Sequence, residues 1–152
     1  MPTPQPGLLS VGGAHAYFLT CTVADDAERT ALSQAIGGML PIARAQATKA
    51  KRAWLLCTIG IGSELWNRLS PARRPAGLRP FRAVKANGRV APATGGDLFV
   101  QITSGRHDLN LDLAMKLVRR LQPLATVAEE THGFRYRDSR DLTGFIDGTE
   151  NP

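Results

Sequence analysis

The sequence predicts an α+β domain with a ferredoxin-like βαββαβ order, in which a four-stranded antiparallel sheet carries its helices on one face. Two observations support this fold class. Four segments have the length and the apolar or β-branched composition of strands. Two amphipathic segments with apolar residues at four-residue steps fall between these strands in the required order. The 152 residues suffice for one hydrophobic core, so we expect a single domain over residues 1–152.

The first strand, helix and second strand are expected between residues 15 and 59. Residues 15–23 are nearly uncharged and rich in aromatic and β-branched side chains, which predicts a central strand. Asp25 and Asp26 can cap the helix that follows, which should end near Ala47. The apolar stripe of this helix consists of Leu32, Ile36 and Leu40. Residues 53–59 are apolar again and predict a second buried strand.

The second half of the chain repeats the alternation of strand and helix. Residues 97–104 alternate between apolar and polar side chains, as a strand with one buried face does. Asp108 is placed to cap a helix that ends before Pro123. The apolar stripe of that helix consists of Leu109, Leu113, Leu117 and Leu121. Residues 125–136 predict the fourth strand, with a bend or bulge near Gly133.

Residues 70–96 separate the second strand from the third and differ in composition from the rest of the chain. A short helix over residues 64–69, capped by Ser63, should lead into them. The segment is rich in proline and arginine and contains no acidic residue. We therefore expect a basic, mostly irregular insertion, and loops of this length are usually functional or flexible.

Composition narrows the class of protein. The net charge of +6 suits an anionic partner, such as nucleic acid, a membrane surface or an acidic cofactor, and suits an arginine-rich surface equally well. The N-terminal residues lack the pattern of a secretory signal, and no apolar run could span a bilayer. Cys21 and Cys57 lie in strands that are not neighbours in the predicted sheet, so we expect buried thiols. These features favour a cytoplasmic protein without membrane contact.

The histidines predict no metal site within the chain. His15, His107 and His132 are far apart in sequence, and no cysteine stands at ligand spacing to them. Each is expected to have a structural role, with His107 near the start of a helix. A basic βαββαβ domain could also be an RNA-binding module, but nucleic acid is an unlikely partner on sequence grounds. The predicted central strands lack the glycine and aromatic pattern that such modules use for base stacking.

The last thirteen residues, 140–152, form a turn-rich segment around one carboxylate. Asp147 lies between the apolar pair Phe145 and Ile146 and the flexible Gly148. A carboxylate in such a setting can be partly desolvated and so adapted to proton transfer. A four-letter Gly-x-x-Asp-Gly match is weak evidence, but the full run from Gly144 to Pro152 is specific.

That run, Gly-Phe-Ile-Asp-Gly-Thr-Glu-Asn-Pro, resembles the signature loop of the dye-decolourising peroxidases, which are haem-dependent oxidoreductases. Residues 103–108 and 129–135 are also similar to the B-type bacterial members. The resemblance extends from about Pro6 to the end of the chain. It implies a protein built from two ferredoxin-like halves, with haem b held mainly by the second half. The chain is then expected to be the N-terminal half, without the iron-ligating histidine and the distal arginine, and inactive alone.

The resemblance also assigns roles to the loop. Asp147 would be the distal acid–base residue that moves the proton of hydrogen peroxide during O–O cleavage. Gly148 and Thr149 would let the backbone approach the porphyrin, and Glu150 would face a propionate. The implied partners are hydrogen peroxide, a dye or phenolic reductant, further copies in a homo-oligomer and, for some members, an encapsulin shell. A non-catalytic assembly domain and the RNA-binding module remain the alternatives.

Overall fold

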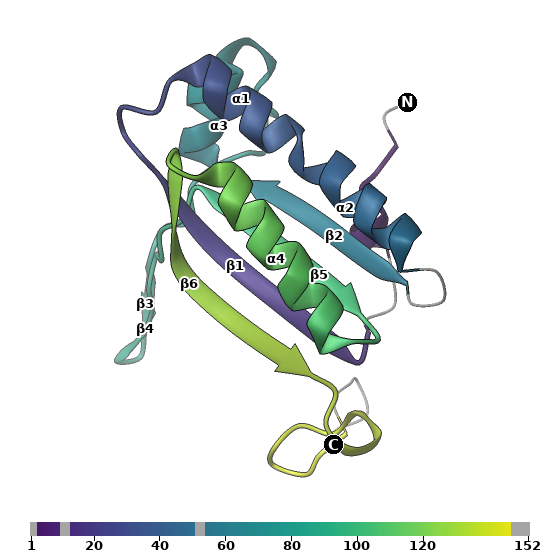
Figure 1. Cartoon of the computed structure of the whole chain (residues 1–152). Coiled ribbons are helices and arrows are strands. Elements are labelled where there is room, and N and C mark those ends of the chain that lie inside the picture. The colour runs from purple at the N-terminus through teal and green to yellow at the C-terminus, as the bar shows by residue number, and fades with distance from the viewer. Residues whose placement is uncertain (1–2, 10–12, 51–53, 147–152) are drawn as a thin grey trace.

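The computed structural model describes residues 3–9, 13–50 and 54–146, and its centre is a four-stranded antiparallel sheet (Figure 1). The strand order is β2–β5–β1–β6. The strands are β1 (His15–Val23), β2 (Leu55–Ile61), β5 (Leu98–Ser104) and β6 (Ala125–Phe134). The predicted α+β class and antiparallel sheet are confirmed. The first and third predicted strands are central, so Cys21 on β1 and Cys57 on β2 are not neighbours, and both are buried thiols.

Helices cover one face of the sheet (Figure 1). The α-helices are α1 (Arg29–Gly37), α2 (Met39–Lys49), α3 (Ser63–Leu69) and α4 (His107–Leu121). Single turns of 3₁₀-helix are η1 (Pro6–Leu8), η2 (Pro71–Arg73) and η3 (Arg137–Ser139). Within the described residues no helix is long and apolar enough to cross a membrane.

The helix predicted after the first strand is two helices. The break falls at Gly38, and Pro41 occupies the first turn of α2, where its missing N–H costs nothing. The guanidinium of Arg120 donates to the carbonyls of Ala35 at 2.8 Å and Gln34 at 2.7 Å. A Cβ at residue 38 would lie 2.1 Å from Arg120 Nη2, so a larger residue there would displace the end of the Arg120 side chain.

The predicted caps were wrong by a few residues. Glu28, not Asp25 or Asp26, caps α1, and its carboxylate accepts the backbone N–H groups of Thr30 and Ala31 at 2.8 Å. These hydrogen bonds, that of Thr30 first, hold the pKa of Glu28 below its usual range. Sequence reasoning chose the first acidic residues after the strand, whereas the helix begins only where the chain has turned back onto the sheet.

Three other boundaries differ from the predictions. Gly62 precedes α3, so Ser63 is its first residue and not its cap. α4 begins at His107, which places Asp108 in the first turn of the helix. β6 ends at Phe134, and its register with β1 shifts between the pairs of Thr20 and Cys21, away from Gly133.

The core lies between the sheet and the helices. The stripe predicted for α4 is confirmed at Leu113, Leu117 and Leu121, all of which are buried. On β1 and β5, alternate residues point into this layer, among them Leu19, Val100 and Ile102. No α-helix of the described residues covers the opposite face of the sheet (Figure 1). The outer edge of β2 is covered near the N-terminus, where the Gln5 amide exchanges two hydrogen bonds of 2.9 Å with the backbone of Ile59.

Residues 70–96, predicted to be mostly irregular, also include short regular elements. They contain η2 and a two-stranded hairpin of β3 (Val84–Ala86) and β4 (Arg89–Ala91). Asn87 and Gly88 form its turn with φ values of +49° and +74°, which is the Asn-Gly signature of a type I′ turn. The hairpin projects from the sheet (Figure 1). We call residues 70–96 the basic arm.

Candidate functional site

The residues predicted to carry the chemistry lie at one end of the chain. Asp147, Gly148, Thr149 and Glu150 are outside the residues that the structure describes. The described residues that precede Asp147, residues 135–146, continue directly from β6, and we call them the approach segment. The site is therefore built here from that approach segment and from the sheet beside it.

A tight turn organises the approach segment. The N–H of Gly144 donates to the carbonyl of Asp141 at 3.1 Å, and the N–H of Asp141 donates to the carbonyl of Phe145 at 2.9 Å. Gly144 has a φ of +96°, in the region that favours glycine. The guanidinium of Arg140 donates to the Gly144 carbonyl at 2.9 Å, and Arg140 forms a β-bridge with Ile146. These bonds fix the conformation of residues 140–146.

The Asp141 carboxylate is used within this turn. It accepts the hydroxyl of Thr143 and also its backbone N–H, the latter at 2.8 Å. The hydroxyl bond is the largest cause that holds the pKa of Asp141 below its usual range. Asp141 is thus a turn-forming carboxylate, which separates its role from the one proposed for Asp147.

An open hollow of about 410 Å³ lies between the approach segment and the helix-free face of the sheet. Its lining combines apolar floor residues with polar residues of the approach segment. The lining residues that matter here are Ala16, Phe18, Gly133, Tyr136, Arg140 and Asp141. Gly133 contributes no side chain to this lining, and a Cβ there would lie 3.4 Å from both Ala16 Cβ and Phe18 Cε2.

Two aromatic rings lie on the two central strands of the helix-free face. Phe18 of β1 and Phe99 of β5 stack with their ring centroids 6.1 Å apart, and Phe99 is 42% exposed. The sequence pattern did not indicate exposed aromatics here, because the strands lack the glycine-rich spacing of RNA-binding modules. This face and the Arg140 guanidinium can together contact a flat apolar ligand that carries anionic groups.

The three histidines gather on the other side of the sheet, against the helices. The ring of His107, at the start of α4, lies 6.0 Å from that of His15 and 5.0 Å from that of His132, between centroids. Tyr17 packs against His132 at 4.2 Å. Sequence reasoning missed this cluster because the contacts depend on strand register, which pairs Tyr17 with His132. Among the described residues, no group of three or more His, Cys, Asp and Glu could hold a metal ion.

Tyr17 and Glu130 form the polar centre of this cluster. The buried Tyr17 hydroxyl donates to the Glu130 carboxylate, which also bonds His132 Nε2 at 2.8 Å. Burial first, and then the Glu130 bond, raises the pKa of Tyr17 to about 12. The Tyr17 bond and then the His132 bond lower the pKa of Glu130.

The Tyr17 environment predicts a loss of stability at alkaline pH. Above pH about 10 the unfolded phenol releases its proton while the folded phenol keeps it, so the free energy of unfolding falls as pH rises, by up to about 1.4 kcal/mol per pH unit. Urea unfolding of Tyr17→Phe between about pH 8 and about pH 11 should show a shallower fall. Tyr136→Phe, at the chain's other tyrosine, is the matched control. Equal slopes for wild type and Tyr17→Phe would refute the assignment.

The fold and the hollow define a class: an α+β domain with an open hollow on the helix-free face of its sheet and Arg140 in the lining of that hollow. The sequence model of one family, described as Dyp-type peroxidase, N-terminal, matches residues 5–135. The chain belongs to the Dyp-type peroxidase family and corresponds to its N-terminal part.

Individual relatives agree with this family. The chain is 43% identical over 150 residues to a dye-decolorizing peroxidase of Brevibacterium linens, a match that covers 99% of this chain and 40% of that protein. The cryo-EM structure of the encapsulated DyP-type peroxidase from Mycobacterium smegmatis has a TM-score of 0.91 and 38% identity, and the match covers 100% of this chain and 48% of that one.

A solved structure with a bound ligand is also similar. A Rhodococcus jostii RHA1 DypB variant in complex with heme has a TM-score of 0.89 and 38% identity, over 99% of this chain and 48% of that one. The chain thus spans less than half the length of each of these three relatives.

Proposed function

We propose that the chain is the N-terminal part of a haem-dependent peroxidase that uses hydrogen peroxide to oxidise dyes, phenols or other small organic molecules. The observation that carries this proposal is the run from Gly144 to Pro152 in a chain that belongs to the Dyp-type peroxidase family. The heme complex of the Rhodococcus jostii relative supports haem b as the cofactor.

The described residues fit the periphery of a haem but not its iron. The rings of Phe18 and Phe99 suit the apolar porphyrin face, and the guanidinium of Arg140 suits a propionate. None of the three histidines lines the hollow. We therefore propose that the iron ligand comes from the part of the relatives' length that this chain does not cover. When bound, haem supplies the oxidising chemistry, and the protein supplies orientation and proton transfer.

The proposed catalytic residue is Asp147. Its carboxylate would accept a proton from one oxygen of hydrogen peroxide and return it to the other oxygen, which leaves as water. The carboxylate is therefore regenerated at the end of the step. Gly148 and Thr149 bring backbone close to the cofactor, since glycine has no Cβ to obstruct it. Glu150 would face a propionate of the bound haem. The turn at Gly144 supports this proposal, because it holds the residues that directly precede Asp147 in one conformation.

The partners and location follow the same proposal. We expect a cytoplasmic homo-oligomer, with small organic reductants as substrates. An encapsulin shell is a further proposed partner, supported by the encapsulated relative from Mycobacterium smegmatis.

Peroxide-dependent oxidation of a dye by the haem-loaded full-length protein tests the proposed function. Loaded protein should show a Soret band and bleach an anthraquinone dye only when peroxide is present. Haem-free protein is the control and should leave the dye unchanged. Stoichiometric haem binding without bleaching above the rate of haem in solution would contradict the proposal.

A further inference from the structure

The N-terminal segment occupies one edge of the sheet. β2 pairs with β5 on its inner side, and among the described residues no strand pairs with its outer side. Residues 3–9 lie against that outer side instead (Figure 1), and we call them the strap. An open strand edge presents a row of N–H and C=O groups with which another chain can pair. The strap therefore lies where an added strand would bind.

The side chain of Gln5 imitates one step of a β-ladder. Its Nε2 donates to the backbone carbonyl of Ile59 at 2.9 Å, and its Oε1 accepts the backbone N–H of Ile59 at 2.9 Å. A neighbouring antiparallel strand would exchange the same two hydrogen bonds through its own backbone. A strand that pairs with β2 at this position must therefore first displace Gln5.

Gly7 brings the strap into close contact with β2. A Cβ at residue 7 would lie 2.2 Å from Thr58 Oγ1 and 3.5 Å from the carbonyl oxygen of Cys57. Cys57 and Ile59 belong to the core, so alternation places Thr58 on the other face of the strand. Thr58 is nevertheless buried, and its hydroxyl has no hydrogen-bond partner among the described residues. The strap therefore packs on β2, and a larger residue at position 7 would disturb that contact.

The strap ends the sheet without offering a new edge. Pro4 and Pro6 have no backbone N–H to donate to a further strand. The N–H of Leu8 donates to the carbonyl of Gln5 at 3.0 Å, and that of Leu9 donates within the same 3₁₀ turn at 3.4 Å. Proline and short irregular segments are common devices that keep sheet edges from pairing.

We propose that the strap blocks a peptide-binding edge on β2, and that its release lets an extended peptide rich in β-branched residues pair with this edge. The backbone N–H and C=O of Ile59 would hold the peptide, as main-chain groups do in strand addition. The strap is suited to release, because Leu8 and Leu9 are 62% and 79% exposed and bury little apolar surface. This edge is independent of haem and of the proposed peroxidase activity.

Two substitutions release the strap in different ways. Gln5→Ala removes both hydrogen bonds to Ile59, and Gly7→Val introduces a clash with Thr58. Hydrogen exchange of the full-length protein, followed by mass spectrometry on peptides that contain β2, should be faster by about tenfold at the Ile59 amide in each variant.

Matched controls make the same changes at sites away from β2. Gln34→Ala replaces an exposed glutamine of α1, and Gly77→Val adds a side chain where a Cβ would meet nothing. Both should exchange at β2 as wild type does. Circular dichroism melting and the Soret band of the haem-loaded protein verify that each variant is folded.

Peptide binding tests the edge itself. A fluorescein-labelled peptide of alternating threonine and valine should bind Gln5→Ala and Gly7→Val at least about tenfold more tightly than wild type, measured by fluorescence anisotropy. An excess of a synthetic peptide with the sequence of residues 1–9 should compete with it, because both occupy the same edge.

Two outcomes would overturn the proposal. Exchange at β2 that stays the same in both strap variants would show that the strap does not protect the edge. Faster exchange without tighter peptide binding would show that the edge is protected but takes no partner strand. Haem content and dye bleaching should remain at the wild-type level in the strap variants, so a failure here is separate from a failure of the proposed function.

Discussion

Replacing Asp147 with asparagine should lower kcat/KM for hydrogen peroxide by about a hundredfold to ten-thousandfold, because a positioned general acid–base contributes about that much to a proton-transfer step. Asparagine has nearly the same shape but cannot accept the proton of peroxide at neutral pH. The measurement is peroxide-dependent dye oxidation by the haem-loaded full-length protein. The Soret absorbance of each variant gives its haem content, so a loss of cofactor is separated from a loss of chemistry.

Asp141→Asn is the matched control for this prediction. Asp141 lies six residues earlier in the same loop, and its carboxylate accepts hydrogen bonds from Thr143 within the turn. It should retain most of the activity with peroxide, because its role is local. Equal losses in the two variants would mean that the loop needs acidic charge in general and not a base at residue 147. An unaffected Asp147→Asn variant would remove the acid–base role outright.

Leu117→Ala should lower the free energy of unfolding by about 2–5 kcal/mol. Leu117 is fully buried in α4, where its side chain belongs to the layer between the helices and the sheet. The truncation removes apolar contacts and leaves a cavity that a close-packed interior refills poorly. Such a loss is a large fraction of the stability of a domain of this size. Urea unfolding followed by circular dichroism measures it.

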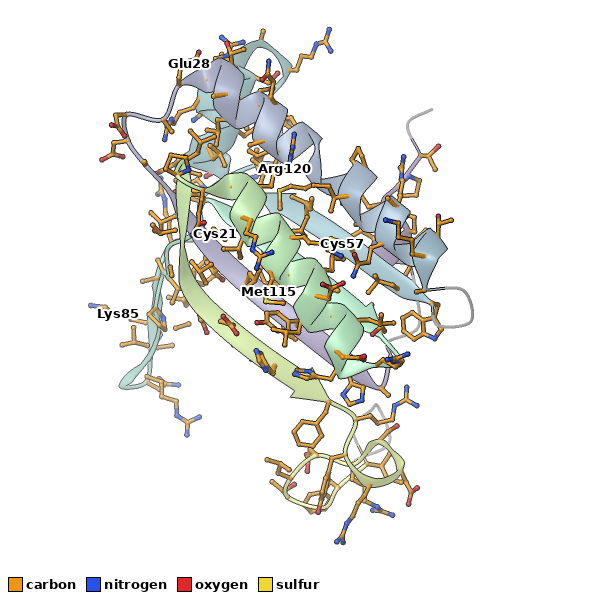
Figure 2. The ribbon with its side chains drawn as sticks, viewed as in Figure 1. Cys21, Glu28, Cys57, Lys85, Met115 and Arg120 are labelled. Carbon is orange, nitrogen blue, oxygen red and sulfur yellow. The ribbon has the colours of Figure 1, made fainter. Side chains whose placement is uncertain are left out.

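Met115→Ala, two residues away on the same helix, is the control for the core. Met115 is 43% exposed on the outer side of α4 (Figure 2), so its loss should cost less than about 1 kcal/mol. Alanine also preserves helix propensity at both positions. Similar costs for the two substitutions would contradict the burial pattern and the register of α4 on the sheet.

The parts of the fold that follow from periodicity were predictable. Leucines at four-residue steps identified α4, and the alternation from residue 98 to 104 identified β5, since each pattern reflects one buried face. The strand and helix order then restricted the sheet to one common topology, with β1 and β5 at its centre. The break between α1 and α2 had a local signal, because Gly37, Gly38 and Pro41 predict a weak or kinked helix there. The cap of α1 at Glu28 was not predicted, because it depends on where the chain turns back onto the sheet.

The candidate site was predictable in part. The signature loop could be read in sequence because its chemistry lies in consecutive residues, whereas the hollow beside it could not. That hollow is lined by Phe18 from β1 and Arg140 from the approach segment, which are about 120 positions apart in sequence and come together only in the folded chain. The histidine cluster around Tyr17 was missed for the same reason. The hairpin in the basic arm had a local signal, Asn87-Gly88, that the proline-rich composition obscured.

The rate at which hydrogen peroxide changes the Soret band, measured by stopped flow over a range of pH, tests the central claim most directly. In the wild-type full-length protein this rate should rise as pH increases through the titration of the Asp147 carboxyl, because the ionised form is the base. In Asp147→Asn the rate should be low, and that titration should be absent from its pH profile. A wild-type protein and an asparagine variant with the same rate and the same pH profile would contradict the account.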